Sequence, residues 1–333
     1  MRVFIVKANT LFITAIYNLF IKDDLGQGFE ITPGLFVTNN IDYIHRLTQP
    51  DYVSTIIGSL EMNILLSGQP VIYRIAQLGK EEDPQEKLKE FLYEVQAFIQ
   101  CFWFQMDCSV NNELAFSIHW TSEGARIDSN FIATNFTNTQ GEVIDFSLDK
   151  VKLEQVTLNY YNNFRPLMQW LGQYRTQMTT ETHRAERALY YITRARTQSD
   201  LGLRIADYCS AFEAFFSTSI AELSHQLAER IAVLLASDPA MRISLYKSVK
   251  AIYGIRSKVV HGALLKKREL NNLHIMSTEC DKIARNMFKT FFDRQSLRTA
   301  MSAADNLVLD NYYRRSVWDQ VLKYNKSYII FAA

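Results

Sequence analysis

The segment Arg256-Ser-Lys-Val-Val-His261-Gly combines two residue types that suit chemistry on a phosphodiester. A histidine can move protons near neutral pH, and an arginine keeps its charge while binding phosphate oxygens in a bidentate way. RNA carries its own nucleophile, the 2′-hydroxyl, so a proton carrier and a cation could cleave it without a metal ion. A lone histidine at a helix end is more often a capping or core residue, so the spacing alone does not select this chemistry.

Positive charge is concentrated around this segment. Residues 241–268 contain eight basic residues and no Asp or Glu, in a chain whose formal net charge is only +1. Such a patch can bind a phosphodiester backbone through charge and the release of counterions. The alternative is a solvated helix face that pairs with acidic residues elsewhere in the fold. The eight residues are Arg242, Lys247, Lys250, Arg256, Lys258, Lys266, Lys267 and Arg268.

The spacing of Arg256 and His261 limits how both can reach one phosphate. Five residues of an ideal helix place two side chains about 140° apart, so they do not share a face. Two arrangements would resolve this. His261 can lie in the last turn, with Gly262 in the left-handed conformation that ends the helix. The site can also be assembled across a twofold axis from two copies of the segment.

The elements that must position these residues differ between the two halves of the chain. Residues 1–150 contain β-branched and aromatic runs separated by Gly, Pro and Asn, which predict strands, a hairpin over residues 111–136 and one helix that begins after Asp83. Residues 151–333 show helical periodicity throughout. We therefore predict an α+β protein with a mixed N-terminal domain and an all-α C-terminal domain, the boundary being uncertain by tens of residues. The helices are expected near 150–173, 181–197, 199–217, 221–236, 240–261, 269–292 and 297–325.

The helical half resembles the HEPN superfamily, and within it the ApeA-like HEPN domains, over about residues 183–290. In the second helix, Phe212-Glu213-Ala214-Phe215-Phe216 matches the core signature of that branch. The Arg-x4-His segment follows in the expected order, preceded by an aromatic residue and ending in His-Gly. The sequences that carry the resemblance are RALYYITRARTQSD, LGLRIADYCSAFEAFF, ELSHQLAERIAVLL and AIYGIRSKVVHG.

This resemblance implies a helical bundle that dimerises and acts as a metal-independent ribonuclease in toxin or anti-phage roles. Arg256 and His261 would be the catalytic pair, and Glu213 would orient the site or a basic partner. Ser257 would occupy the polar position after the arginine, where Asn, His or Asp is common in the superfamily. The RNA-binding residues would be Lys250, Tyr253, Lys258, Lys266, Lys267 and Arg268.

Composition narrows the remaining classes of function. The near-balance of 36 basic and 35 acidic residues excludes a protein that coats nucleic acid by net charge alone. Four cysteines without Cys-x-x-Cys spacing indicate reduced thiols and a cytoplasmic protein. The apolar run from Leu11 to Ile21 is too short to span a bilayer. Glu222 and His225 form a Glu-x-x-His pair, but no second such pair exists, so we expect neither a metal nor another cofactor.

We therefore expect a homodimeric endoribonuclease, with tRNA as one candidate substrate. The N-terminal domain would sense a phage trigger, bind a regulatory partner or restrain the nuclease. The first alternative is a non-catalytic module that binds RNA, a nucleotide or a protein through the same basic face. A second places the function in the N-terminal domain and leaves the helices as a dimerisation platform.

Overall fold

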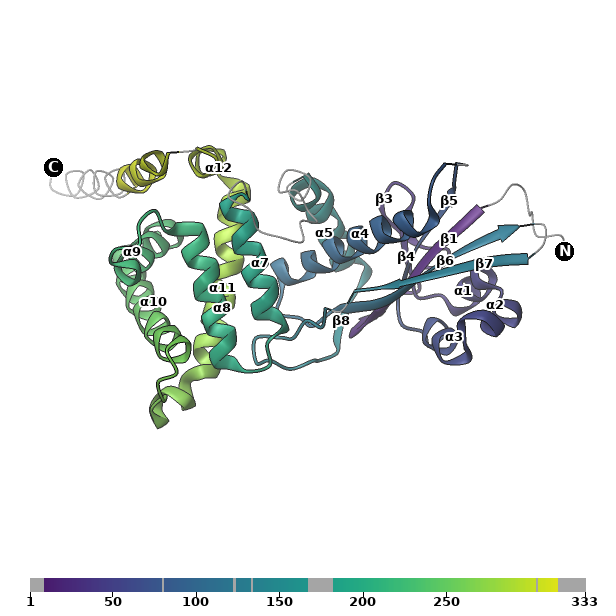
Figure 1. Ribbon diagram of the computed structural model, residues 1–333, viewed down its shortest axis with the longest axis horizontal. Helices are drawn as coiled ribbons and strands as arrows, with labels where there is room; N and C mark the ends of the chain where they lie inside the picture. The colour runs from purple at the N-terminus through teal and green to yellow at the C-terminus, as the bar shows by residue number, and fades with distance from the viewer. Residues whose placement is uncertain are drawn as a thin grey trace. The chain divides into compact units, whose positions relative to one another are not determined.

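A computed structural model describes residues 9–79, 81–121, 124–132, 134–166, 182–303 and 305–316 (Figure 1). The chain forms two compact units. The first comprises Met1–Asn138 and Val143–Trp170, and the second comprises Thr139–Glu142 and Leu171–Ala333. The first unit contains an antiparallel sheet with helices, and the second is helical, which confirms the predicted α+β class.

The sheet of the first unit has the strand order β3-β4-β5-β1-β6-β7, and every neighbouring pair is antiparallel. The central strand β1 is buried along its length because both faces of the sheet are covered. The predicted hairpin is confirmed as β6 and β7. The bounds are β1 Asn9–Tyr17, β3 Phe29–Thr32, β4 Leu35–Thr38, β5 Val71–Gln77, β6 Asn111–Thr121 and β7 Gly124–Phe131; β2 Leu19–Ile21 and β8 Phe146–Leu148 form a separate parallel pair.

One face of this sheet packs against α4, Pro84–Gln105, which contacts β6 and β7. The cap is as the sequence predicts: the Asp83 side chain accepts a hydrogen bond from the Gln85 N–H at 3.1 Å, and Pro84 takes the first helical position. The apolar residues at three- and four-residue spacing are all buried, which confirms the predicted stripe. They are Leu88, Phe91, Leu92, Val95, Phe98, Ile99 and Phe102.

Three short helices also contact this unit's strands and one another: α1, Ile41–Thr48, α2, Pro50–Ile57, and α3, Ser59–Leu65. Helix α3 contacts β1 and α2 contacts β7, and buried residues of all three join the apolar cluster that includes Leu11 and Ile13. The prediction of a single helix in this half was therefore wrong. Each segment is only seven or eight residues long, too short for a helical period to stand out.

The second unit consists of packed helices around α8, Leu201–Phe216, which contacts α7, α9, α10 and α11. The predicted helices lie where the periodicity places them, except at the C-terminal end. There α12 ends at Met301 and helix resumes over residues 306–316, so one continuous helix over 297–325 was wrong; residues 317–325 lie outside the described part. The other bounds are α7 Arg184–Thr197, α9 Leu223–Leu235, α10 Pro239–Val260, α11 Lys267–Asp293 and α12 Gln295–Met301.

The helix expected over 150–173 belongs to the first unit. It consists of α5, Lys150–Asn159, followed by a π-helical turn, Tyr160–Phe164, and the residues beyond 166 in the expected range lie outside the described part. Among the described residues, no helix is both long and apolar enough to span a membrane. All four cysteines are buried.

A short segment within the first half of the chain belongs to the second unit. Residues Thr139–Glu142 lie on α11, where Ser277 Oγ donates to the Thr139 carbonyl at 2.6 Å and Gln140 Nε2 donates to Thr278 Oγ1 at 2.9 Å. Gly141 has φ +77°, and a Cβ there would lie 2.4 Å from the Ser199 carbonyl oxygen. Only glycine fits this position without a backbone shift.

Candidate nucleic-acid site at the end of helix α10

Helix α10, which carries the Arg-x4-His segment, has a capping motif at each end. Asp238 caps its start by accepting from the Met241 N–H at 2.9 Å, with Pro239 in the first turn. Its end is a Schellman motif: the Gly262 N–H donates to the Val259 carbonyl, and the Ala263 N–H donates to the Lys258 carbonyl at 2.8 Å. Gly262 has φ +69°, so the predicted glycine stop directly after His261 is confirmed.

Arg256 is held by a carboxylate from α8. Its Nη2 lies 3.1 Å from Glu213 Oε1 and 3.2 Å from Glu213 Oε2, and both side chains are about one-fifth exposed. The guanidinium also lies 5.4 Å from the centre of the Tyr253 ring, one turn earlier on α10. Burial and the charge of Glu213 raise the pKa of Tyr253 to about 12, so its hydroxyl stays protonated at neutral pH. The three residues form one cluster between the two helices.

His261 lies outside this cluster. It occupies the cap position of α10 and is exposed, and its backbone N–H donates to the Ser257 carbonyl at 3.2 Å. Its ring makes no hydrogen bond or ion pair with any residue that the structure describes. Among those residues, no hydrogen bond or ring contact joins His261 to Arg256. The structure thus brings Arg256, Glu213 and Tyr253 together and leaves His261 accessible.

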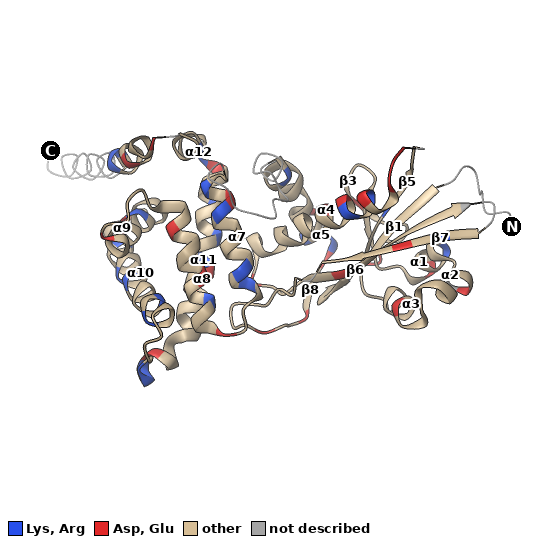
Figure 2. Cartoon of the chain, viewed as in Figure 1, with Lys and Arg blue, Asp and Glu red and all other residues tan. Residues whose placement is uncertain are grey.

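The predicted RNA-binding cations divide into two groups. Lys258 is taken up by an ion pair, with its Nζ 2.5 Å from Glu269 Oε1. The hydrogen bond from Lys258, together with that from the Lys266 N–H, lowers the pKa of Glu269. The others are exposed and form no ion pair within the described residues; blue segments lie along α10 and at the tip between α10 and α11 (Figure 2). They are Lys250, Lys266, Lys267 and Arg268.

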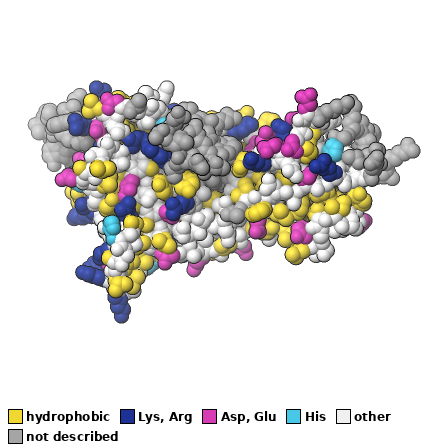
Figure 3. Space-filling model, viewed as in Figure 1, with side chains coloured by type: hydrophobic (Ala, Val, Ile, Leu, Met, Phe, Trp, Pro, Cys, Tyr) yellow, Lys and Arg dark blue, Asp and Glu magenta, His cyan; other side chains and the backbone are white. Residues whose placement is uncertain are grey.

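Figure 3 shows the same tip as a dark blue projection of the helical unit, beside exposed apolar side chains. Leu264 is 93% exposed in the loop that joins the two helices. Lys266, Lys267 and Arg268 follow this loop directly, are exposed and form no ion pair with the described residues. They can therefore bind an external anion.

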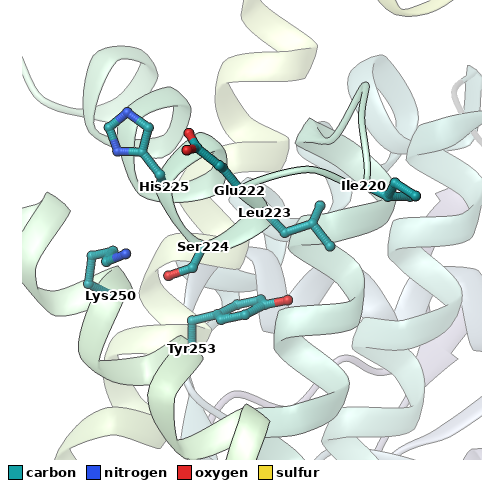
Figure 4. A pocket seen from close by; sticks show the side chains of 7 residues that line it. All are labelled: Ile220, Glu222, Leu223, Ser224, His225, Lys250 and Tyr253. Carbon is teal, nitrogen blue, oxygen red and sulfur yellow. The ribbon is translucent and has the colours of Figure 1, made fainter.

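An open hollow of about 690 Å³ lies beside the Arg256 cluster (Figure 4). Tyr253 and Lys250 of α10 line one side, and residues at the start of α9 line the other. Sequence reasoning interpreted the Glu-x-x-His pair as a solvated or hydrogen-bonded face and missed this hollow, because nothing in the sequence shows that the start of α9 lies beside α10. The lining residues are Ile220, Glu222, Leu223, Ser224, His225, Lys250 and Tyr253.

The Glu-x-x-His pair has another use here. His225 Nδ1 lies 2.8 Å from the Tyr246 hydroxyl, which joins α9 to α10, and Glu222 adopts the left-handed φ of +50° at the start of α9. Across the described ranges, no group of three or more His, Cys, Asp or Glu side chains is placed to hold a metal ion. His225 therefore links the two helices through an exposed hydrogen bond, in agreement with the hydrogen-bonded face that the sequence suggests.

Comparisons with known proteins do not extend this description. No family model matches the chain, and neither the curated proteins nor the solved structures contain a match. The resemblance to HEPN domains therefore rests on the residues quoted above, and the function is argued from the site itself.

Proposed function

We propose that the second unit is a metal-independent endoribonuclease of the HEPN type. The observation that supports it most is that an exposed histidine ends the same basic helix whose arginine is held by a carboxylate. Arg256 is ordered by Glu213 and Tyr253, while His261 stays accessible. A prepositioned cation and an accessible proton carrier are the two groups that RNA cleavage through the 2′-hydroxyl requires.

In the proposed reaction, the ribose 2′-oxygen attacks phosphorus and the bond from phosphorus to the 5′-oxygen breaks. His261 takes the proton of the 2′-hydroxyl or delivers one to the leaving oxygen. Arg256 binds the phosphate oxygens, on which negative charge increases in the transition state. The products are a 2′,3′-cyclic phosphate and a free 5′-hydroxyl, and no electrons are transferred.

The site as proposed needs two chains. Arg256 points toward α8, whereas His261 lies at the exposed helix end, so one chain does not present both to one phosphate. A twofold pairing of two α10 ends would place Arg256 of one chain near His261 of the other. The protein would then be an obligate dimer for activity, located in the cytoplasm and used in anti-phage defence or toxin-like growth arrest. The first unit would sense the trigger or restrain cleavage.

The direct test incubates purified full-length protein with total tRNA in the presence of EDTA and maps the product ends. We expect His261→Asn to lower the rate by about 10²- to 10⁴-fold and Arg256→Ala by about 10²- to 10³-fold. His274→Asn is the matched control, because His274 is an exposed histidine on α11. Equal cleavage by all four proteins, or product ends without cyclic phosphate, would rule out this active site.

A second candidate is a non-catalytic module that binds RNA or a nucleotide. The exposed lysines at the α10 tip, Lys266 and Lys267, form no ion pair within the described part of the chain and favour it, since lysines bind phosphates by charge and require no proton transfer. The pH dependence separates the candidates. Cleavage should change over the pH range in which histidines titrate, whereas binding by lysines should stay constant there.

A further inference from the structure

Apart from the Tyr253 ring, which also contacts Arg256, the hollow beside Arg256 is lined by chemical groups that take no part in the proposed cleavage. Its lining contains an aromatic ring, an ammonium group, a carboxylate, a hydroxyl and two aliphatic side chains (Figure 4). Its volume of about 690 Å³ falls in the range of small-molecule sites. The Lys250 ammonium forms no ion pair with the described residues and points into the hollow. A ligand can therefore meet a free positive charge beside an aromatic ring.

Each of these groups has a counterpart in a nucleotide. The Tyr253 ring can stack on a base, an interaction that does not depend on which base it is. Lys250 can bind a phosphate as a point charge. The Glu222 carboxylate can accept hydrogen bonds from ribose hydroxyls, as acidic side chains do in dinucleotide sites. Leu223 and Ile220 supply apolar surface at the opposite end of the hollow from Lys250.

The hollow and the proposed proton carrier also lie along one stripe of α10. From Lys250, Ser257 is seven residues further and His261 eleven, which places all three within about 40° of one another on an ideal helix. The axial distance from Lys250 to His261 is about 16 Å at the helical rise. An RNA strand that follows this stripe would pass the hollow and reach His261. Arg256 lies about 120° from Lys250 around the axis, on the side that faces Glu213.

We propose that this hollow is the subsite for one nucleotide of the RNA, with the base on Tyr253, the phosphate at Lys250 and the ribose hydroxyls at Glu222. The assignment rests on the proposed function, because RNA is the substrate there. It adds a place where ribose is distinguished from deoxyribose. Cleavage chemistry at His261 is not needed for binding at this subsite, so the two can be tested apart.

The test measures binding of adenosine 5′-monophosphate to the full-length protein by saturation-transfer NMR, beside 2′-deoxyadenosine 5′-monophosphate. We expect Tyr253→Leu to raise the Kd by about 5- to 150-fold through lost stacking, and Lys250→Gln by about tenfold or more through the lost charge. Glu222→Gln should reduce the preference for the ribonucleotide over the deoxyribonucleotide. Lys289→Gln, which removes an exposed charge from α11, should leave the Kd unchanged.

Tyr253→Phe is the control for misfolding, because it keeps the aromatic ring and removes only the hydroxyl. Retained binding by Phe with loss by Leu supports the stacking role. Absence of nucleotide binding to the wild type, or binding that neither Tyr253→Leu nor Lys250→Gln weakens, overturns the subsite. If binding follows these expectations while no RNA is cut, the proposed nuclease fails and the nucleotide site stands. If RNA is cut but the variants bind the nucleotide normally, the proposed nuclease stands and the nucleotide subsite fails.

Discussion

The interior of the helical unit and the exposed end of α10 both carry polar side chains that could take part in chemistry, in opposite settings. In the interior, Asp281 of α11 is fully buried, accepts from the Tyr208 hydroxyl at 2.7 Å and pairs with Arg285 at 2.8 Å. At the end of α10, His261 is exposed and its ring is unbonded within the described residues. Burying a charge is costly unless it is paired, so the interior groups serve the fold. The exposed groups cost the fold little and are available to a ligand.

Removing the buried carboxylate should produce the largest change in stability. Asp281→Ala leaves Arg285 and the Tyr208 hydroxyl without this acceptor, and we expect the free energy of unfolding to fall by about 3–5 kcal/mol. Urea unfolding followed by circular dichroism measures it. Asp293→Ala removes an exposed acid from the end of the same helix and should change stability by less than about 0.5 kcal/mol. Similar small losses in both variants would contradict the structural role of the pair.

The hydroxyl of Tyr208 should contribute the next largest effect, and its contribution should depend on pH. Tyr208→Phe removes a hydrogen bond to a charged group, which costs about 1.5–3 kcal/mol at neutral pH. Burial, and then the nearby Asp281, raise the pKa of Tyr208 well above its ordinary value. The stabilisation is therefore complete below the unfolded-state pKa of about 10 and is lost as pH rises above it. The difference between wild type and Tyr208→Phe should shrink above pH 10; a constant difference would contradict this assignment.

His183 should make a second pH-dependent contribution to stability, in the acidic range. It caps α7 with Nδ1 accepting from the Ala185 N–H at 3.2 Å, and burial, then Arg184 and Arg187, lower its pKa to about 4. Protonation of Nδ1 would remove the cap. The stabilisation is therefore present above the unfolded-state pKa of about 6.5 and is lost as pH falls toward 4.

His183→Asn keeps a capping oxygen and cannot titrate in this range. Between pH 6.5 and 4, its free energy of unfolding should fall less steeply than that of the wild type, by at most about 1.4 kcal/mol per pH unit. Parallel pH curves for the two proteins would show that His183 is not the group that titrates.

The smallest expected change in stability belongs to His261. His261→Asn should alter the free energy of unfolding by less than about 0.5 kcal/mol, since the side chain is exposed and its ring makes no hydrogen bond with the described residues. The same variant should show the large loss of cleavage proposed above. Thermal melts of wild type and variant at one pH measure the first effect. A stability loss comparable to that of Asp281→Ala would place His261 with the interior groups.

Local signals in the sequence predicted much of this architecture. Asp83 and Pro84 mark the start of α4, and Gly262 marks the end of α10, because caps depend on a few adjacent residues. The break between Met301 and residue 306 contains no glycine or proline. The helical periodicity therefore predicted one continuous helix across it. The three short helices over residues 41–65 were missed because stability at that length comes from packing rather than from propensity.

The site was only partly accessible to sequence reasoning. Arg256 and Glu213 are 43 positions apart, and no spacing rule brings them together; only the packing of α8 against α10 does. Lys258 was assigned to RNA, but it pairs with Glu269, which lies one residue beyond the acid-free stretch. The hollow depends on the start of α9 approaching α10, which is a tertiary relation. Residue types led to the hypothesis of RNA cleavage, whereas packing determines which of the described cations form ion pairs.

Residues 139–142 belong to the helical unit, although the residues on both sides of them in the chain belong to the first unit. This limits how the protein can be divided into fragments. The chain crosses between the units three times, after Asn138, after Glu142 and after Trp170. A fragment that begins at residue 151 would therefore lack part of the helical unit, including the partners of Ser277 and Thr278 on α11. No single cut in the chain therefore separates the two units without loss of these contacts. A fragment of the helical unit would need the four-residue segment supplied separately to keep these contacts.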